Sequence, residues 1–286
     1  MTTDDSQVNV REDASDETRT AAYLAVAGAA AIGRRRTEEM AAALETEETV
    51  LRARVGDARA AEPSESDLRE SRRVRLALRE SMEAWRRYIP GAEPVSFRLH
   101  EHTQLKFPPY DTAWRWGNAE TQVSDQAGGF INIKGDSDHS NPVNSACGVG
   151  LFISSDVNAS VQVRPYVQYK WHYYASADTT LSHATSTGGV DLSAWQGSTL
   201  VSSVTRPQLF HRRVSVGEVD AKDGEGTVFP PDYSINFFMA AGVEYAVNIG
   251  AWVQCEHTRG ATLISLADAL GEIEAHVRWV TIERFV

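Results

Sequence analysis

The stretch Ser145–Ser176, SACGVGLFISSDVNASVQVRPYVQYKWHYYAS, decides the fold that we expect for this chain. It reads as two long strands that are joined by a polar turn. The second strand has a clear two-residue alternation, which is typical of a sheet with one face in a core and one face toward solvent or a partner. The predicted core face of that strand carries Val161, Val163, Val167, Tyr169, Trp171 and Tyr173.

The opposite face of the second strand is the best candidate for a binding site. It carries aromatic and basic groups in an otherwise acidic protein: Arg164, Tyr166, Lys170, His172 and Tyr174. Tyr and Arg are enriched at binding hot spots, and aromatic rings can also stack on sugars while Arg and His donate hydrogen bonds to hydroxyls. Two interpretations stay open: a protein or carbohydrate ligand binds this face, or a second layer, a neighbouring subunit or a helical segment covers it.

The two cysteines of the chain fall on predicted core faces. Alternation groups Cys147 with Val149, Leu151 and Ile153, and it groups Cys255 with Val253. Because free cysteine is among the most buried residue types, two buried thiols are the favoured interpretation, and a disulfide across the core is the alternative. Two cysteines are too few for a disulfide scaffold or a multi-cysteine zinc site.

The composition becomes rich in Gly, Ser, Thr, Val and aromatic residues after Pro94, which predicts a β domain over residues 95–286. Turn signals occur at intervals that suit a sandwich or barrel. Pro165 predicts a bulge or an edge position in its long strand. The expected strands are Val95–Leu105, Ala113–Trp116, Gly129–Lys134, Ala146–Ile153, Ser160–Tyr174, Gly189–Trp195, Gln208–Gly217, Tyr233–Met239, Glu244–Glu256 and Glu272–Phe285.

One segment near the C-terminus resembles jelly-roll and carbohydrate-binding sandwiches in texture. In Ala240–Val247, AAGVEYAV, a turn that contains Gly leads to an inward Tyr on a penultimate strand. This resemblance implies a sandwich of jelly-roll type and transfers no residue role.

The N-terminal part has helical rather than β periodicity. Residues 17–62 lack proline and carry an apolar stripe at helical spacing, and Pro63 ends that segment. A second stripe runs from Val74 to Ile89 before Pro90. The two segments predict a helical hairpin over residues 17–90, which follows a flexible N-terminus at residues 1–16. Its narrow stripes indicate that it needs a partner, either another copy of itself or the β domain, and self-association through a coiled coil or small bundle is favoured.

Ala21–Gly33 stands out within the first helical segment because it is made mostly of Ala and Gly. Its small residues allow another element to approach closely, with Gly28 and Gly33 as contact points. A helix that is tightly packed in an assembly is favoured, and insertion into a membrane after a conformational change is the alternative. Its 13 residues fall short of the roughly 20 that a membrane-spanning helix needs, so no stable span is expected.

Net charge and the N-terminus restrict the partners and the compartment. A formal net charge of −11 disfavours nucleic acid as a partner. The acidic N-terminus lacks the basic and apolar regions of a signal peptide, so a cytoplasmic protein is the default expectation, with non-Sec export or assembly into a particle as alternatives.

The chain carries no nucleotide, metalloprotease or serine-hydrolase motif, so no catalytic residue, metal ligand or cofactor is assigned. The segments 135–141 and 218–226 are rich in oxygen ligands but lack EF-hand spacing, and solvated loops are favoured over calcium sites. His100 and His102 would lie on one face of a strand, where His276 could complete a metal site. That pair underlies the alternative of a metal-dependent hydrolase.

The predicted fold class is therefore α+β in two parts: an N-terminal α-helical hairpin (17–90), then an antiparallel β-sandwich of jelly-roll type (95–286). The favoured function is a non-enzymatic, self-assembling or binding protein that forms a homo-oligomer through its helices. A pore-forming or membrane-active effector is the first alternative, and the metal-dependent hydrolase is the second.

Overall fold

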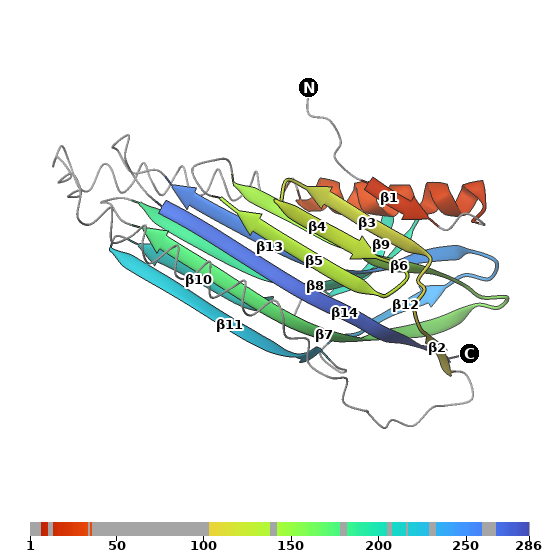
Figure 1. Cartoon of the computed structure of the whole chain (residues 1–286). Helices are drawn as coiled ribbons and strands as arrows, with labels where there is room; N and C mark the ends of the chain where they lie inside the picture. The colour runs from red at the N-terminus through yellow and green to blue at the C-terminus, as the bar shows by residue number, and fades with distance from the viewer. Residues whose placement is uncertain are drawn as a thin grey trace.

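The computed structural model of this chain describes residues 7–10, 14–33, 35, 103–137, 142–177, 182–204, 208–215, 217–228, 233–258 and 267–285. Within these residues the chain is mostly antiparallel β-sheet, with one short helix at residues 16–33 (Figure 1). The strands are β1 (Gln7–Val10), β2 (Thr103–Lys106), β3 (Thr112–Gly117), β4 (Thr121–Asp125), β5 (Phe130–Asp136), β6 (Val143–Ser154), β7 (Ala159–Ala177), β8 (His183–Gln196), β9 (Thr199–Val204), β10 (Gln208–Ser215), β11 (Glu218–Val228), β12 (Ile235–Met239), β13 (Glu244–Thr258) and β14 (Ala267–Phe285).

The strands form two sheets that pack face to face as a sandwich. Sheet A has the order β1-β3-β6-β13-β8-β10, with β9 also paired to β8. Sheet B has the order β11-β7-β14-β5-β4, with β12 paired to β7 and β2 paired to β14. The chain changes sheet at each step from β5 to β8 and again from β13 to β14. This alternation places β6-β13-β8-β10 against β5-β14-β7-β11, which is the strand arrangement of a jelly roll.

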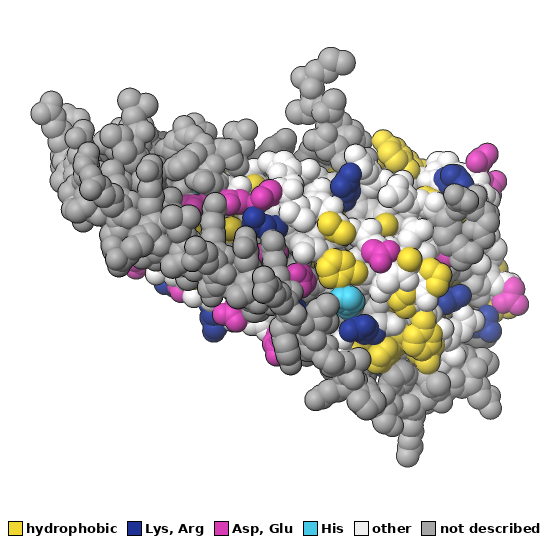
Figure 2. All heavy atoms as spheres, in the orientation of Figure 1, with side chains coloured by type: hydrophobic (Ala, Val, Ile, Leu, Met, Phe, Trp, Pro, Cys, Tyr) yellow, Lys and Arg dark blue, Asp and Glu magenta, His cyan; other side chains and the backbone are white. Residues whose placement is uncertain are grey.

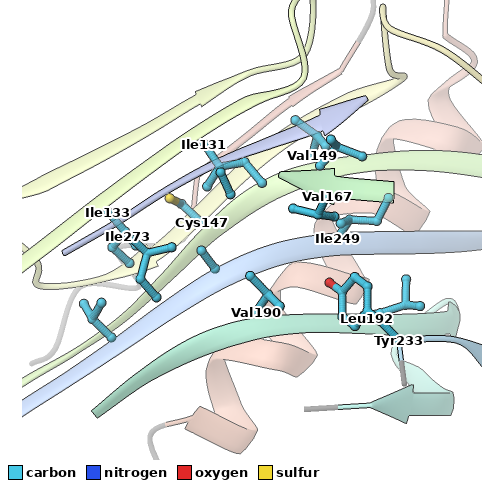
Figure 3. Close-up of a cluster of buried hydrophobic side chains, with 14 of the residues drawn as sticks. Ile131, Ile133, Cys147, Val149, Val167, Val190, Leu192, Tyr233, Ile249 and Ile273 are labelled. Carbon is cyan, nitrogen blue, oxygen red and sulfur yellow. The ribbon is translucent and has the colours of Figure 1, made fainter. Parts of the chain in front are cut away.

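The core lies between the inner faces of the two sheets (Figure 3). Ile131 and Ile273 of sheet B are buried there with Val149, Leu192 and Ile249 of sheet A, each at most 1% exposed. Branched side chains suit strands because they pack well on a pleated surface, and burying one contributes about 1.5–3 kcal/mol. The inner faces of β6 and β7 carry the apolar residues that the alternation predicts.

Both cysteines are free and buried in this core, on sheet A. Cys147 of β6 lies opposite Ala251 of β13, and Cys255 of β13 lies opposite Val143. Four residues of strand therefore separate the two positions, about 13 Å at the usual rise, which is beyond the reach of a disulfide. Burial raises the pKa of the Cys147 thiol to about 12, so this group stays protonated.

The long strand β7 lies inside sheet B, and Pro165 lies at an interruption in its pairing. On one side of β7, β12 pairs with residues up to Val163 and β11 pairs with residues from Val167 onward. Pro165 falls between these two ladders, where its missing N–H breaks no pair. On the other side, the register of β14 shifts between Val277 and Trp279, which places the expected irregularity on the neighbouring strand.

The predicted two-part α+β architecture is wrong. The described residues contain no helical hairpin, because their one helix lies against the outer face of sheet A and is part of the sandwich. The sequence prediction placed a helix over these residues but did not decide what it packs on. Residues 36–102, which include the second predicted helix as well as His100 and His102, lie outside the described residues. Among the described residues, no helix combines the length and apolar character that crossing a bilayer requires.

Residues 218–226, expected as a solvated loop, instead belong to the strand β11. Each residue of β11 pairs with one of β7, from Glu218 opposite Ala177 to Val228 opposite Val167. Its four acidic side chains disguised the strand, because Asp and Glu are depleted in most strands. Of the other oxygen-rich segment, residues 138–141 lie outside the described part of the chain.

Candidate ligand-binding site

The five predicted binding residues lie on the outer face of sheet B, where they are mostly enclosed. Tyr166, Lys170, His172 and Tyr174 are 3–6% exposed, and Arg164 keeps about a quarter of its side-chain surface. The alternation therefore identified one face of β7 correctly, but that face is not an open platform of aromatic and basic groups.

Contacts between neighbouring strands use much of this row. The Lys170 ammonium lies 3.3 Å from the Glu274 carboxylate of β14, and both side chains are largely buried. Arg164 forms an ion pair with Glu283. The Tyr166 ring stacks on Trp279, with ring centroids 4.0 Å apart and planes 4° from parallel. Such cross-strand pairs stabilise a sheet.

His172 is held neutral in this environment. Burial lowers its pKa to about 4, and the opposing influence of Asp223 on the adjacent strand is smaller. Its neighbours in register are Asp223 of β11 and Glu272 of β14.

The metal site that the sequence suggested is not assembled in the described part of the chain. His276 packs against Phe130 with ring centroids 4.9 Å apart, and burial lowers its pKa. Within the described residues, no three His, Cys, Asp or Glu side chains form a group that could hold a metal ion. Figure 2 shows acidic, basic and hydrophobic side chains interspersed on the described surface of one face.

A different aromatic surface lies on the outer face of sheet A. Four of the seven tryptophans gather there from β3, β8 and β13: Trp114, Trp116, Trp195 and Trp252. Space for their indoles comes from small residues at outward positions of the central strands β6 and β13, namely Ala146, Gly148, Gly150, Ala246 and Gly250. A sheet with larger residues at these positions could not accept flat rings on its surface.

The indole of Trp114 lies across the two central glycines. A methyl group added at Gly148 would come within 2.6 Å of this ring, and so would one added at Gly250. The ring N–H of Trp114 donates a hydrogen bond to the Val149 carbonyl, at 3.3 Å. On β8, the Trp195 ring N–H donates to Ser193 Oγ at 2.8 Å. Packing and hydrogen bonds therefore fix the orientation of both rings.

The N-terminal helix covers part of this tryptophan surface. Its Ala25, Val26 and Ala30 are almost fully buried against the indoles. A Cβ atom at Gly28 would lie 2.7 Å from the Trp195 ring, and one at Gly33 would lie 2.2 Å from the Trp116 ring. The close approach expected at these two glycines is thus made to sheet A of the same chain.

A cavity of about 180 Å³ remains between the helix and the sheet. Its walls include all four indoles and polar side chains at their edges: Asn144, Asp191, Ser193, Ser203, Asn248 and Gln254. Asn144 also donates a hydrogen bond to the Gly33 carbonyl at 3.0 Å, which ties the helix end to the cavity rim. Flat apolar rings beside amides, hydroxyls and a carboxylate suit a small ligand with an apolar face and a polar edge.

The ring N–H of Trp252 is a donor without an acceptor at this site. Its nitrogen is closed off from solvent and has no hydrogen-bond partner within the part of the chain that the structure describes. Buried donors are nearly always paired, and leaving one unpaired costs about 1–3 kcal/mol. Because no water-sized atom reaches this nitrogen, a ligand in the cavity would contact the partly exposed indole ring of Trp252 and not its N–H.

The sequence contained a signal for this surface that the focus on β7 missed. The same alternation that turns Ile249 and Val253 inward turns Gly250 and Trp252 outward. Outward glycines beside outward tryptophans indicate a face on which rings lie flat. The helix that completes the cavity is more than a hundred residues away in the sequence, so its position could not be read from local patterns.

Comparisons with known proteins identify no family for this chain. No family model matches it, and no curated protein does. Among solved structures, a CocE/NonD family hydrolase from Staphylococcus aureus is similar at 10% identity and a TM-score of 0.20, over 64% of this chain and 36% of the hydrolase. The Clostridium thermocellum xylanase 10B CBM22-1–GH10 modules, complexed with xylohexaose, give 10% identity and a TM-score of 0.16, over 62% of this chain and 25% of that one.

A structure of infectious bursal disease virus, Gx strain, gives 8% identity and a TM-score of 0.15, over 68% of this chain and 44% of the viral chain. This chain therefore spans less than half the length of each of these proteins. At these TM-scores the similarities carry no argument about fold or function.

Proposed function

We propose that this protein is a non-enzymatic binding protein that takes a carbohydrate in the tryptophan-lined cavity between the N-terminal helix and sheet A. The observation that carries the proposal is the four-indole surface with polar side chains at its edge.

The chemistry of a sugar ring matches this surface. One side of a pyranose presents C–H groups that pack on an aromatic face, whereas its edge presents hydroxyls that both donate and accept hydrogen bonds. In the cavity, Asn248 and Gln254 supply amides, and Ser193 and Ser203 supply hydroxyls. The volume of about 180 Å³ suits a single ring rather than a long chain.

Two other expectations, self-association and membrane activity, do not depend on a sugar in this cavity. Self-association through the helix would need its apolar face, but that face is packed on sheet A in this structure. Oligomerisation of the whole protein therefore stays a proposal for light scattering to test. Release of the helix into a membrane would uncover the same tryptophans, and dye leakage from liposomes would detect such activity.

The decisive experiment is a titration with a panel of neutral gluco-, manno-, galacto- and xylo-oligosaccharides, measured by calorimetry. We expect at least one sugar to bind. Trp195→Ala removes an indole from the wall of the cavity and should weaken binding about tenfold, which equals ~1.4 kcal/mol. Trp252→Ala removes a partly exposed indole ring from the cavity wall and should weaken binding by a similar factor.

Trp279→Phe is the matched control, because Trp279 stacks on Tyr166 on the other sheet. It should leave the affinity unchanged. The proposal fails if no sugar in the panel binds, or if the two cavity variants bind as tightly as the wild type.

A further inference from the structure

A second and larger cavity lies at the end of the sandwich where β6 turns into β7. Its volume is about 310 Å³. Residues from both sheets line it, since β6 belongs to sheet A while β2, β7, β12 and β14 belong to sheet B. It shares no lining residue with the tryptophan-lined cavity.

The floor of this second cavity is apolar. Ile153, Val161, Met239 and Ile282 are 2–8% exposed and belong to the core between the sheets. An aliphatic chain that covers such a floor gains about 0.8 kcal/mol for each methylene group removed from water.

Two cations, Lys106 and Arg284, lie at the sides of this apolar floor. In the β2–β14 pair, Lys106 lies opposite Val280 and Gln104 lies opposite Ile282. Arg284 lies two residues beyond Ile282 on β14. The side chains of Lys106, Ile282 and Arg284 therefore share the face of sheet B that looks toward the core. The order along the cavity is therefore cation, apolar residue, cation, and the two cations are about 13 Å apart along the strand.

The lining contains both of these cations and no Asp or Glu, in a chain with 39 acidic and 28 basic residues. One carboxylate approaches from outside, because Arg284 pairs with Asp156 at 3.2 Å. That Asp156 side chain is 86% exposed, and such surface ion pairs contribute about 0–1 kcal/mol. An incoming carboxylate can therefore compete for the guanidinium.

We propose that this end cavity binds a linear aliphatic dicarboxylate. One carboxylate pairs with the Arg284 guanidinium, which suits two-point recognition of a carboxylate, and the other pairs with the Lys106 ammonium. The methylene chain between them covers Ile282 and its apolar neighbours. Thr103, Ser154 and Ser155 supply further polar groups to the carboxylates.

The test uses octanedioate as the probe and octanoate as its matched partner with one carboxylate. Binding to the full chain is measured by calorimetry at low salt. Octanedioate should bind saturably and about tenfold more tightly than octanoate, because it reaches both cations. Lys106→Gln and Arg284→Gln should each remove most of that difference.

Lys222→Gln is the control, because Lys222 is an exposed cation on β11, away from the cavity. It should leave octanedioate binding unchanged, and thermal unfolding should show that every variant is folded. Ser154→Trp fills the mouth from an exposed position and should abolish binding without touching either cation. Equal affinity for the two probes, or octanedioate binding that survives the Lys106, Arg284 and Ser154 substitutions, overturns the proposal.

Discussion

At the scale of single residues, side chains on the outer face of sheet B that were predicted to bind a ligand make contacts within the protein instead. Arg164, Tyr166 and Lys170 have the chemistry of a binding surface. In the folded chain they contact Glu283, Trp279 and Glu274. Their positions on one face follow from the two-residue period, but the acidic and aromatic partners come from β14, more than a hundred residues later. The local sequence pattern of β7 could not identify these partners.

His172 makes the stability of the protein depend on pH. Its folded pKa of about 4 lies below its ordinary value near 6.5, because burial disfavours the charged form. Between these values the unfolded chain binds a proton that the folded chain does not, so stability is fully present above pH 6.5 and is lost as the pH falls toward 4. We expect this residue to contribute a loss of roughly 2–3 kcal/mol over that range.

Urea unfolding between pH 4 and 7, followed by circular dichroism, checks this prediction. His172→Gln cannot titrate and should show a shallower decline than the wild type. Carboxylates protonate in both proteins, so the difference between the two curves isolates the histidine. Identical curves would show that His172 carries no such pH dependence.

At the scale of elements, the contact between the N-terminal helix and sheet A depends on residues without side chains. Gly28 and Gly33 let the helix backbone reach Trp195 and Trp116. The sequence predicted close approach at these glycines and placed the helix itself. It left the partner open between another copy of the chain and the β domain, because an apolar stripe shows that a helix needs a partner surface but does not identify that surface.

Gly28→Leu should push the helix away from Trp195, because even its Cβ atom would lie 2.7 Å from the ring. Overpacking of this kind costs about 1–3 kcal/mol, and we expect the free energy of unfolding to fall by that amount. Tryptophan quenching by acrylamide should increase in the same variant.

Ala31→Leu adds a side chain to the exposed side of the same helix and serves as the control. It should leave both stability and quenching near wild type. If the two variants behave alike, the helix is not held through Gly28.

At the scale of the whole molecule, the strands of the sandwich were the most predictable part. Long alternating runs such as those of β6, β7 and β13 are recognisable alone, since half of each strand faces the core. The edge strand β11 was missed because charged residues fill it, and β9, TLVSSV, was missed because its apolar residues do not alternate with polar ones. The separate helical domain was a wrong prediction, because periodicity describes an element and not its place in the fold.

A bound sugar should stabilise the whole sandwich, because its site joins the helix to five strands of sheet A. At a concentration one hundred times the Kd, a ligand adds about 2.7 kcal/mol to the free energy of unfolding. For a domain of this size we expect the Tm to rise by about 5–10 °C.

The Trp195→Ala variant tests this coupling at the same sugar concentration. A tenfold weaker affinity should reduce the added stability to about half, with a matching reduction in the rise in Tm. A full rise in this variant would place the sugar elsewhere on the protein.

The charges of β11 have a consequence for the behaviour of the protein in concentrated solution. Within the described chain β11 pairs only with β7, so its other side presents unpaired backbone groups at the edge of sheet B. Such an edge can recruit the same edge of a second molecule and begin a growing aggregate. The strand EVDAKDGEGTV carries four carboxylates and one ammonium, so two copies repel at neutral pH. Acidification protonates these carboxylates and removes the repulsion. The exposed edge of β11 can then start aggregation, which its charge prevents at neutral pH.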